Sequence, residues 1–288
     1  MISKISTIIK NIVKNKNNDI DNYKIYIKLL DLILKILKYN NIKNMKLILN
    51  SNKYNTDEEF STYIYNKFVK NYKKALSNNM YTQGNLIKSQ YYLNILQKNN
   101  NSNINNYIDI GCGNCNVSYL FGKKLGIKEK NIFGADIKQW FHYEKDTRNK
   151  LINFIELKTG EELPIKNESY DLVSLFMVLH HVFDKPQLIK NINRILKKNK
   201  YLLITDHDIH DIHDNDLVDL EHFFYSRLFE RDQDFYNDYY GEYLNIESMI
   251  DLLKLNNFKI INKGFYNIYK NKIEITSTRY FYILVQKI

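Results

Sequence analysis

The residues with the clearest potential for chemistry lie at 109–113, where the sequence reads DIGCG. A short apolar run ends there in an acid and opens into a glycine turn. Gly111 permits a backbone angle that a side chain would disfavour, and Gly113 lets the main chain approach a ligand closely. A helix that follows such a turn presents unpaired N–H groups and the positive end of its dipole. The pattern predicts a strand that passes into a helix around a bound nucleoside.

The residues around the two glycines indicate what kind of nucleoside would bind. A dinucleotide-binding turn reads G-x-G-x-x-G, and its last glycine lets helix and strand pack closely. Asn116 occupies that last position here. Asp109 stands two residues before the first glycine, where a carboxylate would crowd a pyrophosphate but suits a cationic amino-acid group. An ordinary turn after a strand is the alternative interpretation.

A second acid ends the next strand-like run. Residues 131–136 read NIFGAD, so that Asp136 follows Asp109 by 27 positions. A carboxylate at the end of the second strand can accept hydrogen bonds from both ribose hydroxyls. Ile137 is placed to pack on an adenine face. A surface acid in a loop is the alternative interpretation of Asp136.

These residues require an alternating arrangement of strands and helices. Strands are predicted at 107–110, 131–136, 153–158, 170–176 and 200–206. Helices are predicted between them at about 115–125, 141–150 and 185–198. Such alternation implies right-handed crossovers and a parallel sheet. A helix at 246–257 and a hairpin of two strands, about 258–267 and 276–287, complete the predicted order.

The D-x-G-x-G pattern at 109–113 resembles motif I of the class I S-adenosylmethionine-dependent methyltransferases. The segments LFMVLHHV at 175–182 and RILKKNKYLLI at 194–204 look like the ubiquinone/menaquinone-biosynthesis, small-molecule type. The resemblance covers residues 104–206 well and the final hairpin loosely. It implies an α/β, Rossmann-like seven-stranded sheet with an antiparallel last strand, and methyl transfer from S-adenosyl-L-methionine.

The resemblance also implies roles for individual residues. The methionine end of the cofactor is expected at Asp109, Gly111 and Gly113, and its ribose at Asp136. The other residues expected around the cofactor are Ile137, Thr159, Gly160, Phe176 and Met177. Thr159 departs from the family pattern, in which an acid usually meets the adenine amino group.

A histidine-rich, acidic stretch follows the fifth predicted strand. Six of the seven histidines lie between positions 180 and 222, and residues 206–242 hold 12 acids and 2 basic residues. His181 or His207, beside Asp206, is a candidate general base for the methyl acceptor. An acidic lid at 206–245 could instead attract a cationic substrate. The spacing matches no closed zinc site, so no metal ligand is predicted. An ordinary solvated loop remains the alternative.

The charge is divided unevenly along the chain. Residues 1–103 hold 17 lysines and 6 acids, whereas residues 104–288 hold 25 basic and 26 acidic residues. We therefore expect a lysine-rich helical region at 1–103 and a methyltransferase domain at 104–288. RNA or another polyanion is the expected partner of the basic region. A solvated lysine face is the alternative, since the abundance of Asn, Ile, Lys and Tyr indicates an AT-rich genome.

Two other classes of protein remain open. One is a catalytically inactive, methyltransferase-like RNA-binding or scaffold subunit. The other is a nicotinamide oxidoreductase, against which Asp109 and Asn116 argue. Two cysteines are too few for a disulfide framework. Their C-x-x-C spacing at 112–115 also occurs in redox proteins, but it is a weaker indication of function than the glycine turn that contains it. No signal peptide or long apolar run is seen, so a cytoplasmic protein without a membrane span is expected.

Overall fold

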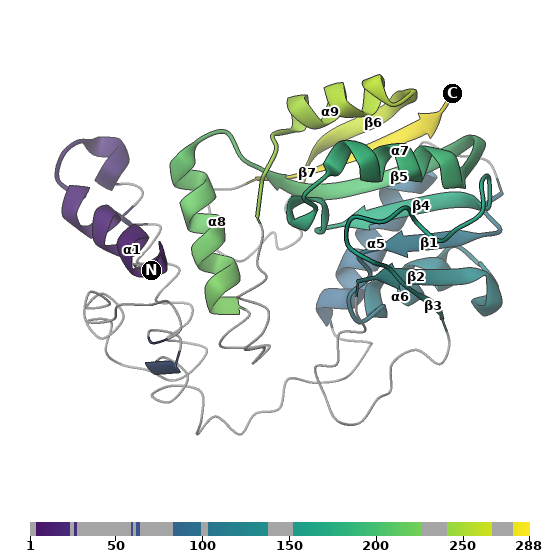
Figure 1. Cartoon of the computed structure of the whole chain (residues 1–288), viewed down its shortest axis with the longest axis horizontal. Coiled ribbons are helices and arrows are strands. Elements are labelled where there is room, and N and C mark those ends of the chain that lie inside the picture. The colour runs from purple at the N-terminus through teal and green to yellow at the C-terminus, as the bar shows by residue number, and fades with distance from the viewer. Residues whose placement is uncertain are drawn as a thin grey trace. The chain divides into compact units, whose positions relative to one another are not determined.

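The computed structural model describes residues 4–23, 26–27, 59, 62–63, 83–98, 103–137, 152–225, 241–266 and 279–288 (Figure 1). The chain divides into two compact units. The larger comprises residues 77–208, 240–270 and 279–288, and the smaller comprises 1–76, 209–239 and 271–278. The helix expected at 141–150 lies outside the described residues. Most of the helical region expected at 1–103 also lies outside the described residues.

A seven-stranded sheet in the order β3-β2-β1-β4-β5-β7-β6 forms the larger unit. Strands β1 to β5 are parallel, and β7 runs antiparallel to both β5 and β6. This arrangement confirms the predicted fold class. The strands are β1 (Tyr107–Ile110), β2 (Ile132–Asp136), β3 (Asn153–Glu156), β4 (Tyr170–Phe176), β5 (Leu196–Asp208), β6 (Phe258–Tyr266) and β7 (Arg279–Lys287).

Helices cover both faces of this sheet. One buried cluster joins the sheet to α7 (Lys185–Ile195) and α9 (Ile246–Leu255). A second joins it to α5 (Gln83–Gln97) and α6 (Asn116–Lys124). Neighbouring residues of one strand alternate between the clusters, with Leu202 in the first and Leu203 in the second. A parallel sheet covered on both faces explains why its central strands are continuous apolar runs.

The fifth strand starts earlier than the sequence predicted. The helix expected at 185–198 ends at Ile195, and β5 already pairs with β4 at Leu196. Asn199 then adopts a left-handed backbone with φ 62°, and the strand continues. The run KKNK at 197–200 conceals this early start because its side chains are polar.

The buried Asp171 carboxylate holds the starts of the central strands together. The Asp171 carboxylate accepts hydrogen bonds from the backbone N–H groups of Asn105 and Asn106 at 2.9 and 3.0 Å. Lys197 Nζ lies 3.0 Å from the other oxygen of Asp171. These contacts join the chain entering β1 to β4 and β5. Short 3-10 turns, η3 (Glu129–Asn131) and η4 (Leu179–His181), precede β2 and follow β4.

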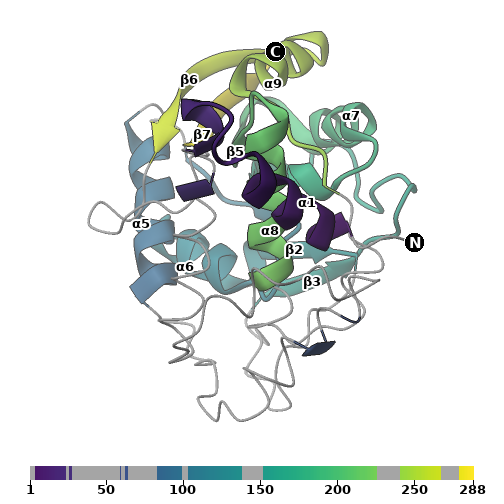
Figure 2. The same cartoon turned by 90° about the vertical axis from the view of Figure 1, so that its left-hand side faces the viewer.

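The smaller unit contains α1 (Lys4–Asn15) and α8 (Ile212–Tyr225), which pack against each other (Figure 2). The buried apolar residues on these two helices are Ile8, Ile9, Ile12, Leu217, Val218 and Leu220. No helix among the described residues has the length and apolar character needed to cross a bilayer.

Candidate cofactor and acceptor site

The glycine turn after β1 combines one crowded position with one open position. Gly111 has φ 74°, and a Cβ atom there would lie 2.1 Å from Cγ2 of Val178. Its N–H and that of Cys112 both donate to the Ala135 carbonyl, at 2.7 and 3.2 Å. Gly113 has φ 54°, and a Cβ atom there would meet nothing within 4 Å. The turn is therefore held against β2 and the segment after β4, while Gly113 borders open space.

Asp136 links the end of β2 to this turn. Its Oδ2 accepts a hydrogen bond from the Gly113 N–H at 2.8 Å, and its Oδ1 accepts one from the Ile137 N–H at 2.8 Å. A carboxylate oxygen can accept more than one hydrogen bond, so these contacts leave Asp136 able to bind hydroxyl groups. Ile137 beside it is 50% exposed. The arrangement suits a ribose next to an apolar ring.

Asp109 lies beneath the turn and is buried. Its two oxygens accept hydrogen bonds from Ser118 Oγ and Ser174 Oγ, each at 2.5 Å. Burial raises the pKa of Asp109 to about 7, although the two serine hydrogen bonds oppose the change. Asp109 thus joins β1 to α6 and β4. Its direct contact with a cationic amino-acid group stays a prediction.

The other residues expected at the cofactor lie in two places. Thr159 and Gly160 form an exposed turn after β3, where Gly160 has φ 78° and a Cβ atom would meet nothing within 4 Å. The Phe176 ring stacks on Tyr92 of α5 at 4.0 Å and is thereby held in the core. Met177 has φ 58°, and its N–H donates to the Thr205 carbonyl at 2.9 Å. The turn at 159–160 is open to a ligand, and a contact between Phe176 and the cofactor stays a prediction.

The two cysteines of the turn contact each other. Cys112 Sγ and Cys115 Sγ are 3.1 Å apart. A Cβ atom at Gly134 of β2 would lie 2.8 Å from each sulfur. The interaction with Cys115, followed by burial, raises the pKa of the Cys112 thiol well above its usual range. Both thiols therefore help to pack the turn on β2.

A second group of polar side chains gathers where β4 and β5 end. Asp206 Oδ1 lies 2.5 Å from Nδ1 of His180, and Asp206 Oδ2 accepts the His180 backbone N–H at 3.1 Å. The backbone N–H of His207 also donates to Asp206 Oδ1, at 2.7 Å. Burial raises the pKa of Asp206, and His207 and His181 oppose that change.

The sequence predicts Asp206, His181 and His207 as candidates for catalysis but does not single out His180. Of the two adjacent histidines, His180 is buried in η4 and pairs with Asp206 through Nδ1. His181 is half-buried, with its ring centre 4.0 Å from that of His180. The signal in the sequence that could have pointed to His180 is the His-His dipeptide at 180–181, which closely follows an apolar strand. It does not say which histidine faces the sheet.

Aromatic rings surround these histidines. The Tyr243 ring stacks on His180 at 5.3 Å, and the Tyr280 ring lies 5.0 Å from that of His207. The segment bearing Tyr243 is fixed by Glu242, whose N–H donates to the His180 carbonyl at 2.9 Å. The Glu242 carboxylate also pairs with Lys185 Nζ at 2.7 Å. Tyr236, Tyr239 and Tyr240, which precede Tyr243 in the sequence, lie outside the described residues.

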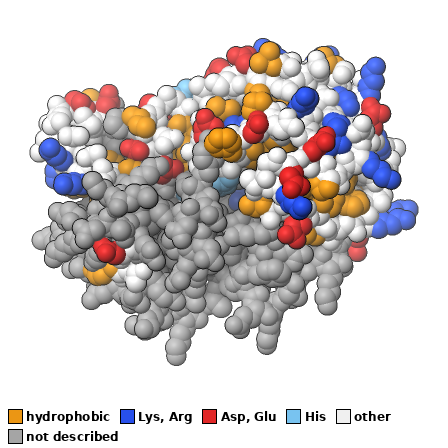
Figure 3. Space-filling view, in the orientation of Figure 1, with side chains coloured by type: hydrophobic (Ala, Val, Ile, Leu, Met, Phe, Trp, Pro, Cys, Tyr) orange, Lys and Arg blue, Asp and Glu red, His pale blue; other side chains and the backbone are white. Residues whose placement is uncertain are grey.

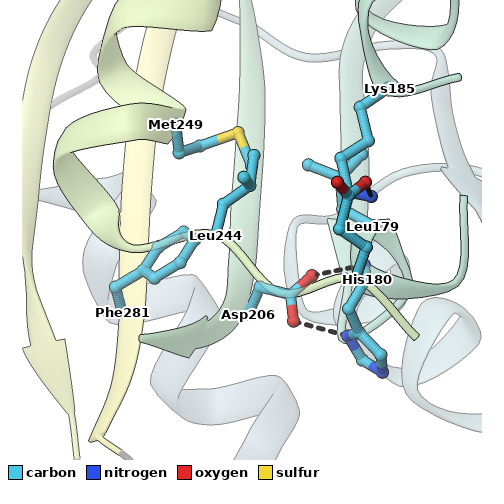
Figure 4. Close-up of a pocket in the computed structure, with 8 residues that line it drawn as sticks. Leu179, His180, Lys185, Asp206, Leu244, Met249 and Phe281 are labelled. Carbon is cyan, nitrogen blue, oxygen red and sulfur yellow. Dashed lines mark hydrogen bonds and ion pairs between the residues drawn. The ribbon is translucent and has the colours of Figure 1, made fainter. Parts of the chain in front are cut away.

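A small hollow adjoins the Asp206–His180 pair (Figure 4). Its lining residues are Leu179, His180, Lys185, Asp206, Glu242, Leu244, Met249 and Phe281. The hollow encloses no space for even a water molecule, so no ligand pocket is open at this place in the described part of the chain. On the face in Figure 3, acidic and basic side chains of the larger unit are interspersed rather than gathered by sign.

Fold and site together define a class of protein. A parallel sheet closed by an antiparallel strand carries a glycine turn after β1 and an acid at the end of β2. This is the Rossmann-like architecture of the class I S-adenosylmethionine-dependent methyltransferases. Residues 73–263 match the model of a family described as a methyltransferase domain. The chain belongs to this family, and S-adenosylmethionine is its cofactor, as predicted.

Individual proteins resemble the chain more distantly. An uncharacterised protein of Methanocaldococcus jannaschii is 33% identical over 106 residues, which are 36% of this chain and 38% of that relative. The match thus spans well under half of either protein. The structure of a Mesorhizobium loti protein described as an S-adenosylmethionine-dependent methyltransferase aligns with a TM-score of 0.50 and 12% identity, covering 70% of this chain and 98% of that one. That likeness shows the shared fold.

Proposed function

We propose that the chain transfers the methyl group of S-adenosylmethionine to an acceptor bound near Asp206. One observation carries the proposal. The turn with the open Gly113 position is hydrogen-bonded to Asp136 and packs on Val178, two residues before His180. A nucleoside site and a cluster of proton-accepting side chains therefore adjoin the same segment of chain.

The residues on the cofactor side fit S-adenosylmethionine. Asp136 would accept hydrogen bonds from the ribose, and Ile137 would cover the adenine. The backbone at Gly113 would accommodate the amino-acid end, while Gly111 and Asp109 hold the turn in place. The exposed turn at Thr159 and Gly160 would border the adenine. The cofactor supplies an already activated methyl group, so the protein chiefly has to position the acceptor about 3 Å from that carbon.

The residues on the acceptor side handle a proton where the acceptor carries one. Asp206 orients His180 through Nδ1, and His181 and His207 are the neighbouring bases. A histidine held by a carboxylate is a suitable general base near neutral pH. Met177, which begins the turn into η4, would shape the floor between the two sides.

The expected surroundings of this site belong to the same proposal. The division into a region at 1–103 and a methyltransferase domain at 104–288, with an acidic lid at 206–245, stays a prediction. Within the predicted lid, Asp206 to Asp208 are buried in β5 and residues 212–225 form α8. A cytoplasmic location likewise stays a prediction.

Calorimetric titration with S-adenosylhomocysteine tests the cofactor side. Asp136→Ala should weaken binding about ten- to a hundredfold, because hydrogen bonds to a charged group contribute about 1.5–3 kcal/mol. Glu156→Gln is the matched control, since Glu156 is the exposed acid paired with Asp136 on the neighbouring strand. Unchanged affinity in a folded Asp136→Ala variant would remove the ribose assignment. Tight binding of a nicotinamide dinucleotide in place of this ligand would favour the oxidoreductase.

The basic region remains a proposed site for RNA or another polyanion. Lys10 and Lys14 of α1 are exposed, as such a role requires. Fluorescence anisotropy with single-stranded RNA should show weaker binding for a Lys10→Gln/Lys14→Gln variant. Equal affinity would mean that these lysines are merely solvated. RNA binding without any cofactor binding would instead support the inactive scaffold subunit.

A further inference from the structure

Three buried side chains bring metal-ligand atoms together at the ends of β4 and β5. His180, Asp206 and His207 each offer one such atom, and these atoms all lie within 4.8 Å of one another. The three residues are 2%, 4% and 4% exposed. They come from two separate segments, η4 and β5, so the sheet rather than a local sequence motif assembles them.

Two imidazoles and one carboxylate form a donor set typical of divalent transition metals. Catalytic zinc sites use three protein ligands of this kind and keep a further position open. Bond lengths of about 2.0–2.2 Å place tetrahedral donor atoms about 3.4 Å apart. On metal binding, the distance of 2.5 Å between His180 Nδ1 and Asp206 Oδ1 would have to increase. Those ligand atoms that lie up to 4.8 Å apart would have to move closer together. Side-chain rotations can supply changes of this size.

The surroundings of Asp206 favour an ion at this place. A buried carboxylate beside two imidazoles is costly unless positive charge compensates it. The backbone N–H groups of His180 and His207 hold the Asp206 oxygens and fix the carboxylate. The rings of Tyr243 and Tyr280 enclose the histidines and limit access of water. Contacts of this outer kind orient metal ligands and tune their affinity.

We propose that His180, Asp206 and His207 bind one divalent transition-metal ion of the zinc class. The sequence spacing predicted no metal ligand, because it did not connect the position of His180 with those of Asp206 and His207. The binding site stands independently of the cofactor. Its use in catalysis rests on the proposed function: the ion's open position would take the acceptor heteroatom and make its proton easier to remove. With His180 and His207 as ligands, the neighbouring His181 would be the base that accepts this proton.

Titration of the metal-stripped full-length chain with Co²⁺, followed by visible absorption, tests the site. Wild type should bind one equivalent with the d–d bands of a four- or five-coordinate ion, and Zn²⁺ should displace it. His207→Gln and Asp206→Asn should each weaken binding by about tenfold or more, since loss of even an outer-shell contact commonly costs about 10–100-fold. His210→Ala, an exposed histidine close in sequence, is the control and should bind like wild type.

Thermal unfolding provides the second readout. Zn²⁺ should raise the melting temperature of wild type and of His210→Ala but not that of His207→Gln. Absence of a saturable one-equivalent site, or wild-type affinity in both His207→Gln and Asp206→Asn, would overturn the proposal. The titration with S-adenosylhomocysteine separates the two proposals. Metal binding without cofactor binding would support the metal site and refute its role in methyl transfer.

Discussion

Gly111 offers the sharpest test of how the turn is built. Alanine at this position would have to keep φ near 74°, which costs a side-chain-bearing residue about 1–2 kcal/mol. Its Cβ would also lie 2.1 Å from Cγ2 and 2.7 Å from Cβ of Val178. Relieving such an overlap in a packed region costs about 1–3 kcal/mol. Gly111→Ala should therefore lower the free energy of unfolding by about 2–5 kcal/mol.

Gly113→Ala is the matched control for this prediction. Gly113 shares the left-handed backbone with φ 54°, but a Cβ atom there meets nothing within 4 Å. Only the backbone cost of about 1–2 kcal/mol should remain. The difference between the two variants isolates the contact with Val178.

Urea unfolding followed by far-ultraviolet circular dichroism measures both variants. Val178→Ala should recover part of the loss in the Gly111→Ala background, because it removes the nearest atom, and a double-mutant cycle gives the coupling. The reasoning would be refuted if Gly111→Ala were no more destabilising than Gly113→Ala. Absence of coupling with Val178 would refute it equally.

Three further predictions concern titratable groups. The pKa of Asp109 is raised from 3.8 to about 7, so its contribution of about 4 kcal/mol to stability is present below pH 4 and lost as the pH rises through 7. Asp109→Asn should remove this dependence in urea unfolding measured from pH 4 to 8, and an unchanged slope would contradict it. The raised pKa of Cys112 predicts that its thiol reacts slowly with a disulfide reagent at pH 7.5. The reaction should be faster at higher pH and in the Cys115→Ala variant. Equal rates for wild type and Cys115→Ala would count against the sulfur contact. Burial acts to raise the pKa of Asp171, but hydrogen bonds from Asn105 and other donors outweigh it and lower the pKa. Asp171→Asn should thus be most destabilising at neutral pH and least so at pH 3, and a loss independent of pH would argue against this account.

Much of the fold could be predicted because burial on both faces leaves a simple pattern. The bounds of β1 and β4 match the predicted 107–110 and 170–176, since each is an apolar run limited by turn residues. The start of β5 could not be predicted in this way. Its first residue, Leu196, pairs with Tyr170 of β4, and the next paired residue is Tyr201, so the polar residues 197–200 lie at an irregularity of the ladder that the sequence pattern does not reveal.

The site was predictable only in part. The special backbone angle predicted for Gly111 follows from residue type and is confirmed, and Gly113 shares it. The hydrogen-bond partners of Asp109 could not be predicted from residue type, because Ser118 and Ser174 lie 9 and 65 positions away in the sequence. The contact of Asp206 with Nδ1 of His180 depends on the turn of η4. Contacts made by the sheet, and not by neighbouring residues, decide these roles.

A crystal structure of the full chain with S-adenosylhomocysteine tests the central claim most directly. The account predicts the ribose at Asp136, the amino-acid end along the backbone at Gly113, and the sulfur facing the side of Asp206 and His180. Density for the ligand away from Asp136 and the glycine turn would contradict it. The same holds for a sulfur that faces away from those two residues.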